Sequence, residues 1–308
     1  MSPLPSRDSR FAGISFAGKS SPRIPVIRGA GSLPCSAKPR LTLRPDRFDE
    51  LEDRTTDDAV FLSETLLSAG LDPARYRMAP LRRRLPACLR ALRANSLHEA
   101  AEILRAAPER LALALNTLLI GTSSFFRDEP VFEHLASSVI PTLVARCTHP
   151  RVWSAACSDG AELYSVAMLL ARYRPLAGDQ LLGSDFRPRA IELAKRGIYP
   201  AEEAAAVPTD LRGRFLSGGR SRVIVSAELR RATRWECRDL LEAPPRQSWD
   251  LVLCRNLAIY LAGPAVENLW KKLAAVLAPG GVLVVGKAEK PRIPGLKRIA
   301  PCIYRYAP

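Results

Sequence analysis

The second half of the chain alternates short apolar runs with amphipathic segments, and this rhythm limits the possible folds more than any other feature. Between the runs lie segments with helical spacing, such as AELYSVAMLLARY and PRAIELAKRG. Runs this apolar must be covered on both faces when they form strands. We therefore predict a doubly wound, mainly parallel α/β sheet. The predicted strands are 151–157, 181–185, 233–240, 249–256, 280–289 and 302–307.

End residues indicate where the helices of this half start and stop. Segment 188–197 closes on Gly197, the residue type that commonly ends a helix. Segment 264–281 begins on Pro264 and ends on Gly280-Gly281, so we predict a helix over its whole length.

The first half shows helical periodicity instead. Ser96 is followed three residues later by Glu99, the pattern of a capping box at a helix start. We expect a small N-terminal all-α domain over 50–140 and the sheet domain over 141–308. Residues 1–49 are rich in Ser, Pro, Arg and Gly without either period, which predicts a disordered basic tail.

Composition excludes several classes of protein. The longest apolar runs fall short of 18 residues, so we expect no membrane insertion. The 7 cysteines form no C-x-x-C pair and the 3 histidines show no metal-ligand spacing, which favours a cytoplasmic protein without a metal site. The net charge of +15 leaves nucleic acid, membrane surface, acidic protein or plain solvent open as partners of the basic surface.

Ligands of doubly wound sheets bind at the carboxyl ends of the strands. The first strand is followed by Cys157-Ser158-Asp159-Gly160-Ala161-Glu162, where Gly160 permits either a tight structural turn or close approach of a ligand. This turn is not the G-x-G-x-x-G of a dinucleotide site. Asp185 ends the second strand, where an acid can grip a ribose diol or cap the next helix.

Two further strand ends carry polar groups. Asp239-Leu240 can accept a hydrogen bond from an adenine amino group and cover its ring, or form a simple turn. Cys254-Arg255-Asn256 ends a very apolar strand, with Tyr260 one helical turn beyond. Burying such a trio without partners is costly, which favours a role in a site.

The connector before the sheet domain holds a second cluster, Gly121 to Arg127. Two adjacent aromatic residues, Phe125-Phe126, precede Arg127 on a polar turn that contains Ser123. This cluster can wedge two domains together, or it can be ordinary packing beside a surface arginine.

Together these motifs resemble the CheR family of chemotaxis receptor methyltransferases. SSFFR at 123–127 is similar to the family's T-S-F-F-R, and WSAACSDGAELYS at 153–165 to W-S-A-x-C-S-x-G-E-E-P-Y-S. SDF at 184–186, AKRGIY at 194–199, CRNLAIY at 254–260 and LAPGGVLVVG at 277–286 match further family motifs in the same order. The resemblance covers roughly residues 60–308.

The resemblance implies a class I S-adenosylmethionine-dependent methyltransferase with a Rossmann-like sheet. Its product would be S-adenosylhomocysteine and its acceptor a glutamate carboxylate on a receptor-like protein. Arg127 and Tyr260 would flank the transferred methyl group as the catalytic residues. The implied cofactor-binding residues are Ser123, Arg127, Gly160, Glu162, Asp185, Asp239, Leu240, Arg255 and Asn256.

The chain departs from the family in two motifs. The family's G-E-E-P-Y-S is here G-A-E-L-Y-S, so Ala161 stands where one acid was, and Asp159 is a possible replacement. The terminal G-H-S-E is here G-K-A-E at 286–289. These losses keep open a sensor or scaffold that binds S-adenosylmethionine or its demethylated product without turnover.

Partner predictions follow from the resemblance and the charge. The basic helical domain would face an acidic receptor-like protein through Arg75, Arg77, Arg82, Arg83 and Arg84. The stretch FLSGGRSRVIVSAELRR is short where the family binds a receptor's C-terminal pentapeptide, so we predict no such tether. A methyltransferase acting on a small molecule or nucleic acid is the remaining alternative. Against nucleic acid, basic and aromatic residues do not interleave as in single-strand binders.

Overall fold

The computed structural model describes residues 46–119, 123–176, 180–242, 244–245 and 247–307. The chain divides into two compact units, Met1–Glu52 and Asp53–Pro308. Residues 1–45 of the predicted tail lie outside the described residues. Helix α1 (Asp46–Ser68) starts before residue 49, where the tail was predicted to end.

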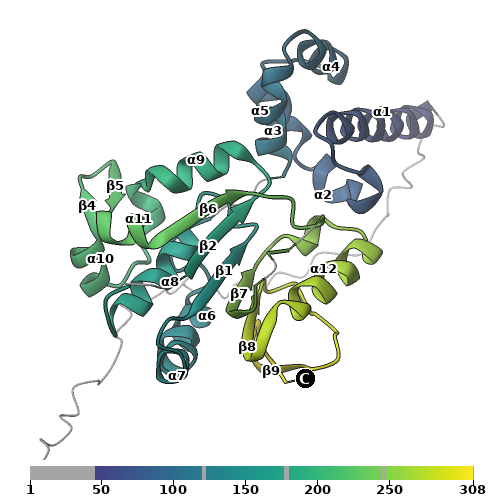
Figure 1. Ribbon diagram of the computed structural model, residues 1–308. Helices are drawn as coiled ribbons and strands as arrows, with labels where there is room; N and C mark the ends of the chain where they lie inside the picture. The colour runs from purple at the N-terminus through teal and green to yellow at the C-terminus, as the bar shows by residue number, and fades with distance from the viewer. Residues whose placement is uncertain (1–45, 120–122, 177–179, 243, 246, 308) are drawn as a thin grey trace, which may run out of the picture. The chain divides into compact units, whose positions relative to one another are not determined.

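Five helices form the first part of the chain (Figure 1). Their shared core contains Leu62, Leu92 and Leu118, all fully buried. Ser96 caps α4 as predicted, because its hydroxyl accepts a hydrogen bond from the Glu99 N–H at 3.1 Å. After α1 the helices are α2 (Met78–Arg82), α3 (Leu85–Leu92), α4 (Leu97–Ala106) and α5 (Leu111–Leu118).

A seven-stranded sheet forms the second part, in the order β6-β2-β1-β7-β8-β10-β9. The first five pair in parallel, and β10 pairs antiparallel with both neighbours. The strand order reverses beside β1, which makes the β1–β7 boundary the topological switch point. The strands are β1 (Arg151–Ala155), β2 (Gln180–Asp185), β6 (Thr233–Cys237), β7 (Trp249–Cys254), β8 (Leu277–Val285), β9 (Leu296–Ala300) and β10 (Ile303–Tyr306).

Both faces of this sheet are buried. On β7, Leu251 and Leu253 belong to one hydrophobic cluster, while Val252 and Cys254 belong to another on the opposite face. This confirms the predicted fold class, a mainly parallel α/β sheet covered on both sides. Its helices are α6 (Glu129–His134), α7 (Ile140–Arg146), α8 (Ala161–Ala171), α9 (Pro188–Arg196), α10 (Thr209–Phe215), α11 (Ala227–Ala232) and α12 (Gly263–Ala275).

One predicted helix is too long. Helix α12 ends at Ala275, and the Gly-Gly pair that was expected to close it lies inside β8. The pairing of β7 with β8 shifts here, because Trp249 faces Leu277 while Leu251 faces Val282. A β-carbon on Gly281 would lie 2.9 Å from the Trp249 carbonyl oxygen. The glycines therefore permit an irregularity in a strand, where the sequence pattern equally suits a helix end.

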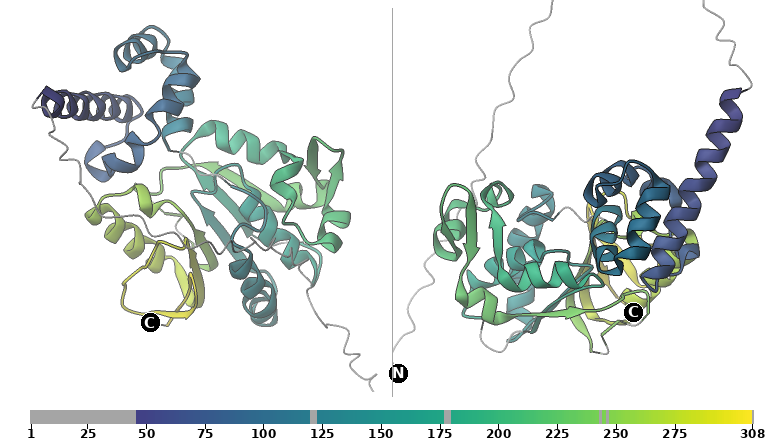
Figure 2. Two further views of the ribbon diagram at one scale, coloured as in Figure 1. Left: turned by 180° about the vertical axis from the view of Figure 1, so that it is seen from behind. Right: turned by 90° about the horizontal axis from the view of Figure 1, so that it is seen from above.

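A second, antiparallel sheet follows α9 and has the order β3-β5-β4. In both views of Figure 2 this green group lies at the other end of the main sheet from the yellow C-terminal strands. The stretch described above as short supplies two strands of this sheet, β4 and β5, and β3 comes from the preceding segment. The strands are β3 (Ile198–Pro200), β4 (Leu216–Gly218) and β5 (Arg222–Val225). Among the described residues, no helix combines the length and apolar character needed to cross a bilayer.

Candidate active site

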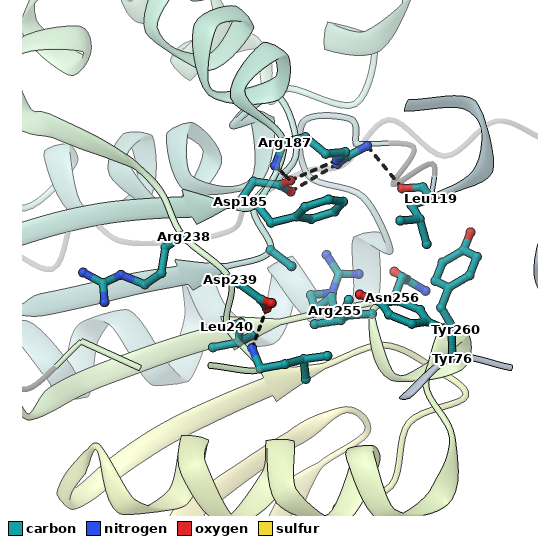
Figure 3. Close-up of a pocket in the computed structure, with 14 residues that line it drawn as sticks. Tyr76, Leu119, Asp185, Arg187, Arg238, Asp239, Leu240, Arg255, Asn256 and Tyr260 are labelled. Carbon is teal, nitrogen blue, oxygen red and sulfur yellow. Dashed lines mark hydrogen bonds and ion pairs between the residues drawn. The ribbon is translucent and has the colours of Figure 1, made fainter. Parts of the chain in front are cut away.

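The carboxyl ends of the parallel strands surround a cavity of about 640 Å³, the larger cavity (Figure 3). It lies at the switch point, because the ends of β1, β2, β6 and β7 all contribute to it. Its lining residues are Tyr76, Leu119, Ala156, Asp185, Phe186, Arg187, Arg238, Asp239, Leu240, Leu241, Arg255, Asn256, Leu257 and Tyr260.

A second cavity of about 380 Å³, the smaller cavity, adjoins the first. The two share Ala156, Arg255 and Asn256 as lining residues. A ligand with an extended shape can therefore occupy both. The lining of the smaller cavity is Ser123, Ser124, Arg127, Ala156, Cys157, Ser158, Glu162, Arg255 and Asn256.

These two cavities gather almost all of the residues predicted from the sequence. The larger cavity takes Asp185, Asp239, Leu240, Arg255, Asn256 and Tyr260. The smaller cavity takes Ser123, Arg127 and Glu162, together with the shared Arg255 and Asn256. The two predicted catalytic residues are thus divided between the cavities, with Arg127 in one and Tyr260 in the other.

Gly160 is the exception, since it belongs to neither lining. It precedes α8 with a φ of +88°, and a β-carbon there would lie 2.4 Å from the Trp235 indole. The close approach that this glycine permits in the described structure is therefore to Trp235, which is the structural alternative left open by the sequence.

Asp185 ends β2 at the wall of the larger cavity, and its carboxylate is held by Arg187. The Arg187 guanidinium donates to both carboxylate oxygens, Nε to Oδ1 at 2.9 Å and Nη2 to Oδ2 at 3.1 Å. The backbone N–H groups of Ser158 and Arg187 donate at 2.9 and 3.0 Å. Both side chains are buried, so this is a desolvated bidentate pair. The alternative role of Asp185, as the cap of the next helix, is met only in part. Arg187, and not Asp185, occupies the cap position of α9.

Glu162 lines the smaller cavity and is held by a second arginine, Arg255. The Arg255 Nη1 donates to Glu162 Oε2 at 3.0 Å, and Ser154 donates to Glu162 Oε1 at 2.9 Å. Arg255 Nη2 also contacts the Asp128 carboxylate and donates to the Arg127 carbonyl oxygen at 3.1 Å. Arg255 therefore joins three segments that lie far apart in the sequence: the start of α8, the end of β7 and the SSFFR motif.

Asp128 connects this network to the altered C-terminal motif. Lys287, which stands where the family has histidine, lies 2.7 Å from Asp128 Oδ1. Burial favours the protonated form of Asp128, but the hydrogen bond from Lys287 and the positive charge of Arg255 outweigh burial and lower the pKa of Asp128. The replacement thus supplies a cation to the edge of the site.

Glu289, the acid retained in that motif, fixes the loop after β7. It is buried and accepts hydrogen bonds from the N–H groups of Gly286, Asn256 and Ala258 at 2.6, 3.0 and 2.7 Å. Burial raises the pKa of Glu289 even though these three donors oppose the shift. Its position ties β8 to the Cys254-Arg255-Asn256 turn.

Asp159, the possible replacement for the missing acid, lines neither cavity. Burial raises the pKa of its carboxyl, while hydrogen bonds from Ala161 and Ser123 act in the opposite direction. Glu203 lies close enough for electrostatic coupling, and burial with the negative charge of Asp159 raises the pKa of Glu203 to about 7. Two carboxyl groups therefore interact beside the turn.

Strained backbone concentrates around these cavities. Among the described residues, seven other than glycine have a φ in the left-handed region, and five of them flank the site. Such conformations persist only where surrounding structure enforces them. The five are Phe126, Asp128, Ala156, Ser158 and Asn256.

Several lining residues were missed from the sequence. Arg187 follows the matched SDF motif by one residue, and its charge at a strand end was a usable signal. Tyr76 and Leu119 come from the helical part of the chain, where no sequence feature points to a cavity. Of the predicted connector cluster, Gly121 and Thr122 lie outside the described residues.

Residues 121–301 match the family model described as CheR methyltransferase, SAM binding domain. The chain belongs to the CheR methyltransferase family. This confirms the resemblance seen in the motifs, the methyltransferase class and S-adenosylmethionine as the cofactor.

Three relatives illustrate the similarity. A probable chemotaxis protein methyltransferase of Rhizobium etli is 29% identical over 249 residues, which is 76% of this chain and 88% of that protein. Chemotaxis protein methyltransferase 2 of Pseudomonas aeruginosa is 30% identical over 236 residues, 71% and 81% respectively. An uncharacterized 104.1 kDa protein in the hypE 3′ region of Rhodobacter capsulatus is 31% identical over 230 residues. The match covers 72% of this chain but 24% of that protein.

The two cavities fit the chemical groups of S-adenosylmethionine. The apolar lining of the larger cavity, which includes Phe186 and Leu240, suits an adenine ring, and Asp239 offers an acceptor for its amino group. Asp185 would provide an acid for the ribose, although Arg187 already donates to both of its oxygens. Glu162 in the smaller cavity would accept from the cationic methionyl amine. A cofactor that donates to either carboxylate must therefore share it with an arginine.

Proposed function

We propose that this chain methylates glutamate carboxylates on an acidic, chemoreceptor-like protein. The observation that carries the proposal is the union of two distant motifs at the smaller cavity, where Arg255 binds both the Arg127 carbonyl oxygen and Glu162. Two relatives are named a probable chemotaxis protein methyltransferase and chemotaxis protein methyltransferase 2, and this chain spans most of each.

The bound cofactor would supply a methyl group on a sulfonium centre. An acceptor glutamate is already ionised near pH 7, so the site needs no strong general base. Arg127 would orient that carboxylate, because a guanidinium fork fixes one planar geometry. Tyr260 would add a hydrogen bond or an aromatic face in the larger cavity. Exclusion of water and alignment then account for catalysis.

The acceptor is tested with a tritiated methyl donor and a purified receptor cytoplasmic fragment. We expect label that alkali releases as methanol, because a glutamate methyl ester is base-labile. Label that survives alkali on every protein acceptor would contradict the proposal. Cofactor binding without transfer to any acceptor would instead favour the sensor.

Arg127→Ala tests the role of that residue. We expect turnover to fall about 100-fold or more, as loss of an orienting group commonly causes. Affinity for S-adenosylhomocysteine, measured by calorimetry, should change less than threefold. Equal losses in turnover and affinity would assign Arg127 to cofactor binding alone.

We further propose that the acidic partner meets the helical part of the chain. Arg77 and Arg83 are exposed, whereas Arg82 and Arg84 are half-buried. Arg75 is already engaged, because its Nη1 lies 2.8 Å from Glu242 Oε1. Charge reversal by Arg77→Glu with Arg83→Glu should raise the KM for the receptor fragment while leaving affinity for the cofactor product unchanged. An unchanged KM would mean that these arginines face solvent and do not bind the acceptor.

Two other expectations are part of this proposal. The cysteines described are all free, as expected for a cytoplasmic enzyme in a reducing compartment. A receptor pentapeptide should not bind, although the small sheet β3-β5-β4 is complete. Titration with such a peptide decides this, and micromolar binding would refute the prediction.

A further inference from the structure

One short stretch of the helical part, residues 75–77, pairs with the sheet domain directly after Tyr260. The Arg77 N–H donates to the Tyr260 carbonyl oxygen at 2.8 Å, and the Ala262 N–H donates to the Arg75 carbonyl oxygen at 2.8 Å. Tyr76 and Leu261 are partners in this antiparallel bridge. Backbone bonds of this kind fix position closely, so the location of this stretch is set by the chain and not only by side-chain packing.

An ion pair fixes the same stretch on its other side. Arg75 Nη1 lies 2.8 Å from Glu242 Oε1, and Glu242 follows the Asp239-Leu240 turn that lines the larger cavity. The stretch is therefore attached to two strand ends of the site, the one after β6 and the one after β7.

This attachment brings the Tyr76 side chain into the wall of the larger cavity. Tyr76 packs against the core of the helices and also against one of the two cores of the sheet domain. Two sheet-domain aromatics, Phe186 and Tyr260, pack against the helical core in return and line the same cavity. Figure 3 shows Tyr76 and Tyr260 on one side of the cavity and Arg238 on the other.

We propose that Tyr76 is a cofactor-binding residue supplied by the helical part of the chain, and that it contacts the adenosine portion of the ligand. The larger cavity is the one with an apolar lining and with the acids suited to ribose and adenine, so an aromatic wall there faces the base.

Linkage gives the proposal a second consequence. If the bound ligand contacts Tyr76, it binds more tightly when the stretch 75–77 is docked, and it must stabilise that docking by the same factor. The two backbone bonds of Arg77 and Ala262 report docking directly. Because the proposed acceptor surface belongs to the same helices, cofactor occupancy would also steady the surface that meets the acceptor.

Calorimetric titration of the full chain with S-adenosylhomocysteine tests the contact. Tyr76→Leu keeps an apolar side chain for docking but removes the aromatic face, so we expect affinity to fall about tenfold, within the range for a lost base–aromatic contact. Tyr76→Phe should stay within about twofold. Leu67→Ala, at a side chain on the same helical part that is 61% exposed, is the control and should bind like the wild type.

Hydrogen exchange supplies a readout that does not depend on affinity alone. The ligand should slow exchange of the Arg77 and Ala262 amides in the wild type, and much less in Tyr76→Leu. Wild-type affinity in Tyr76→Leu, or equal protection in both proteins, would overturn the inference.

The inference concerns the cofactor site, whereas the proposed function concerns the acceptor, so the two fail separately. Transfer to no glutamate with a tenfold affinity loss in Tyr76→Leu would refute the acceptor and keep the contact. Normal transfer to glutamate with unchanged affinity in Tyr76→Leu would support the acceptor and refute the contact.

Discussion

Two of the acids proposed to hold the cofactor are each paired with an arginine, but the two pairs are built differently. Asp185 and Arg187 are two residues apart, and strand end, turn and helix start hold them together. Glu162 and Arg255 are 93 residues apart, and Arg255 also binds Asp128. The first pair can form within one turn, whereas the second exists only after α8, β7 and the SSFFR motif have come together.

The difference separates two tasks in one site. The local pair gives a buried carboxylate its cationic partner without relying on distant structure. The long-range pair connects the methyl-donor end to the motif that carries Arg127, so its loss should disturb geometry as well as charge. Four substitutions test the roles of these and neighbouring charged groups, from the largest expected effect to the smallest.

Arg255→Met should have the largest effect, because it leaves Glu162 without its cation and Asp128 with Lys287 as its cationic partner. We expect a loss of roughly 3–5 kcal/mol in the free energy of unfolding, the range for breaking a buried pair on one side. Urea denaturation measures this loss. Arg255→Lys keeps the charge and should recover part of it. A loss below about 1 kcal/mol would mean that the network holds without Arg255.

Asp185→Ala should weaken S-adenosylhomocysteine binding by about 1–3 kcal/mol, the cost of a lost charge-assisted hydrogen bond. It should also destabilise the fold, because Arg187 stays buried without its carboxylate. Adding Arg187→Met should restore stability but not affinity. If the double variant recovers affinity as well, then Asp185 serves only to neutralise Arg187.

Glu203 differs from the two paired acids, because one of its buried carboxylate oxygens has no hydrogen-bond partner among the described residues. Its pKa is raised to about 7 by burial and by Asp159, from an ordinary 4.5. The folded state therefore favours the protonated form, and this stabilisation is lost as pH rises from about 4.5 through 7. Glu203→Gln should not show that loss, so its stability relative to the wild type should increase between pH 5 and 8. Parallel pH profiles of the two proteins would contradict this.

Lys287→His, which restores the residue type of the family motif, should have the smallest effect. The Lys287 side chain is 69% exposed, and exposed ion pairs contribute about 0–1 kcal/mol. Both stability and product affinity should therefore change by less than about 1 kcal/mol. A larger loss of affinity would make Lys287 part of the cofactor site.

The sequence could predict which residues lie near one another where the fold forces them together. The ends of parallel strands meet at one edge, so Asp185, Asp239 and Asn256 could be grouped before their distances were known. The helix end predicted at Gly280-Gly281 was wrong, because glycines end helices and also permit irregular strands. Tyr76 could not be found, since its place depends on how the helices dock. The Asp185–Arg187 pair required geometry that residue spacing does not give.

The left-handed residues around the cavities also bear on how this enzyme can be improved. Glycine adopts such conformations without steric penalty, so Ala156→Gly removes a cost of about 1 kcal/mol. Selection for heat resistance alone would accept that change and similar ones at Ser158 or Asn256. The resulting catalysts would survive longer and turn over more slowly, because a looser turn no longer aims its neighbours. Directed evolution of this enzyme should therefore keep these residues unchanged and select stabilising substitutions in the helices instead.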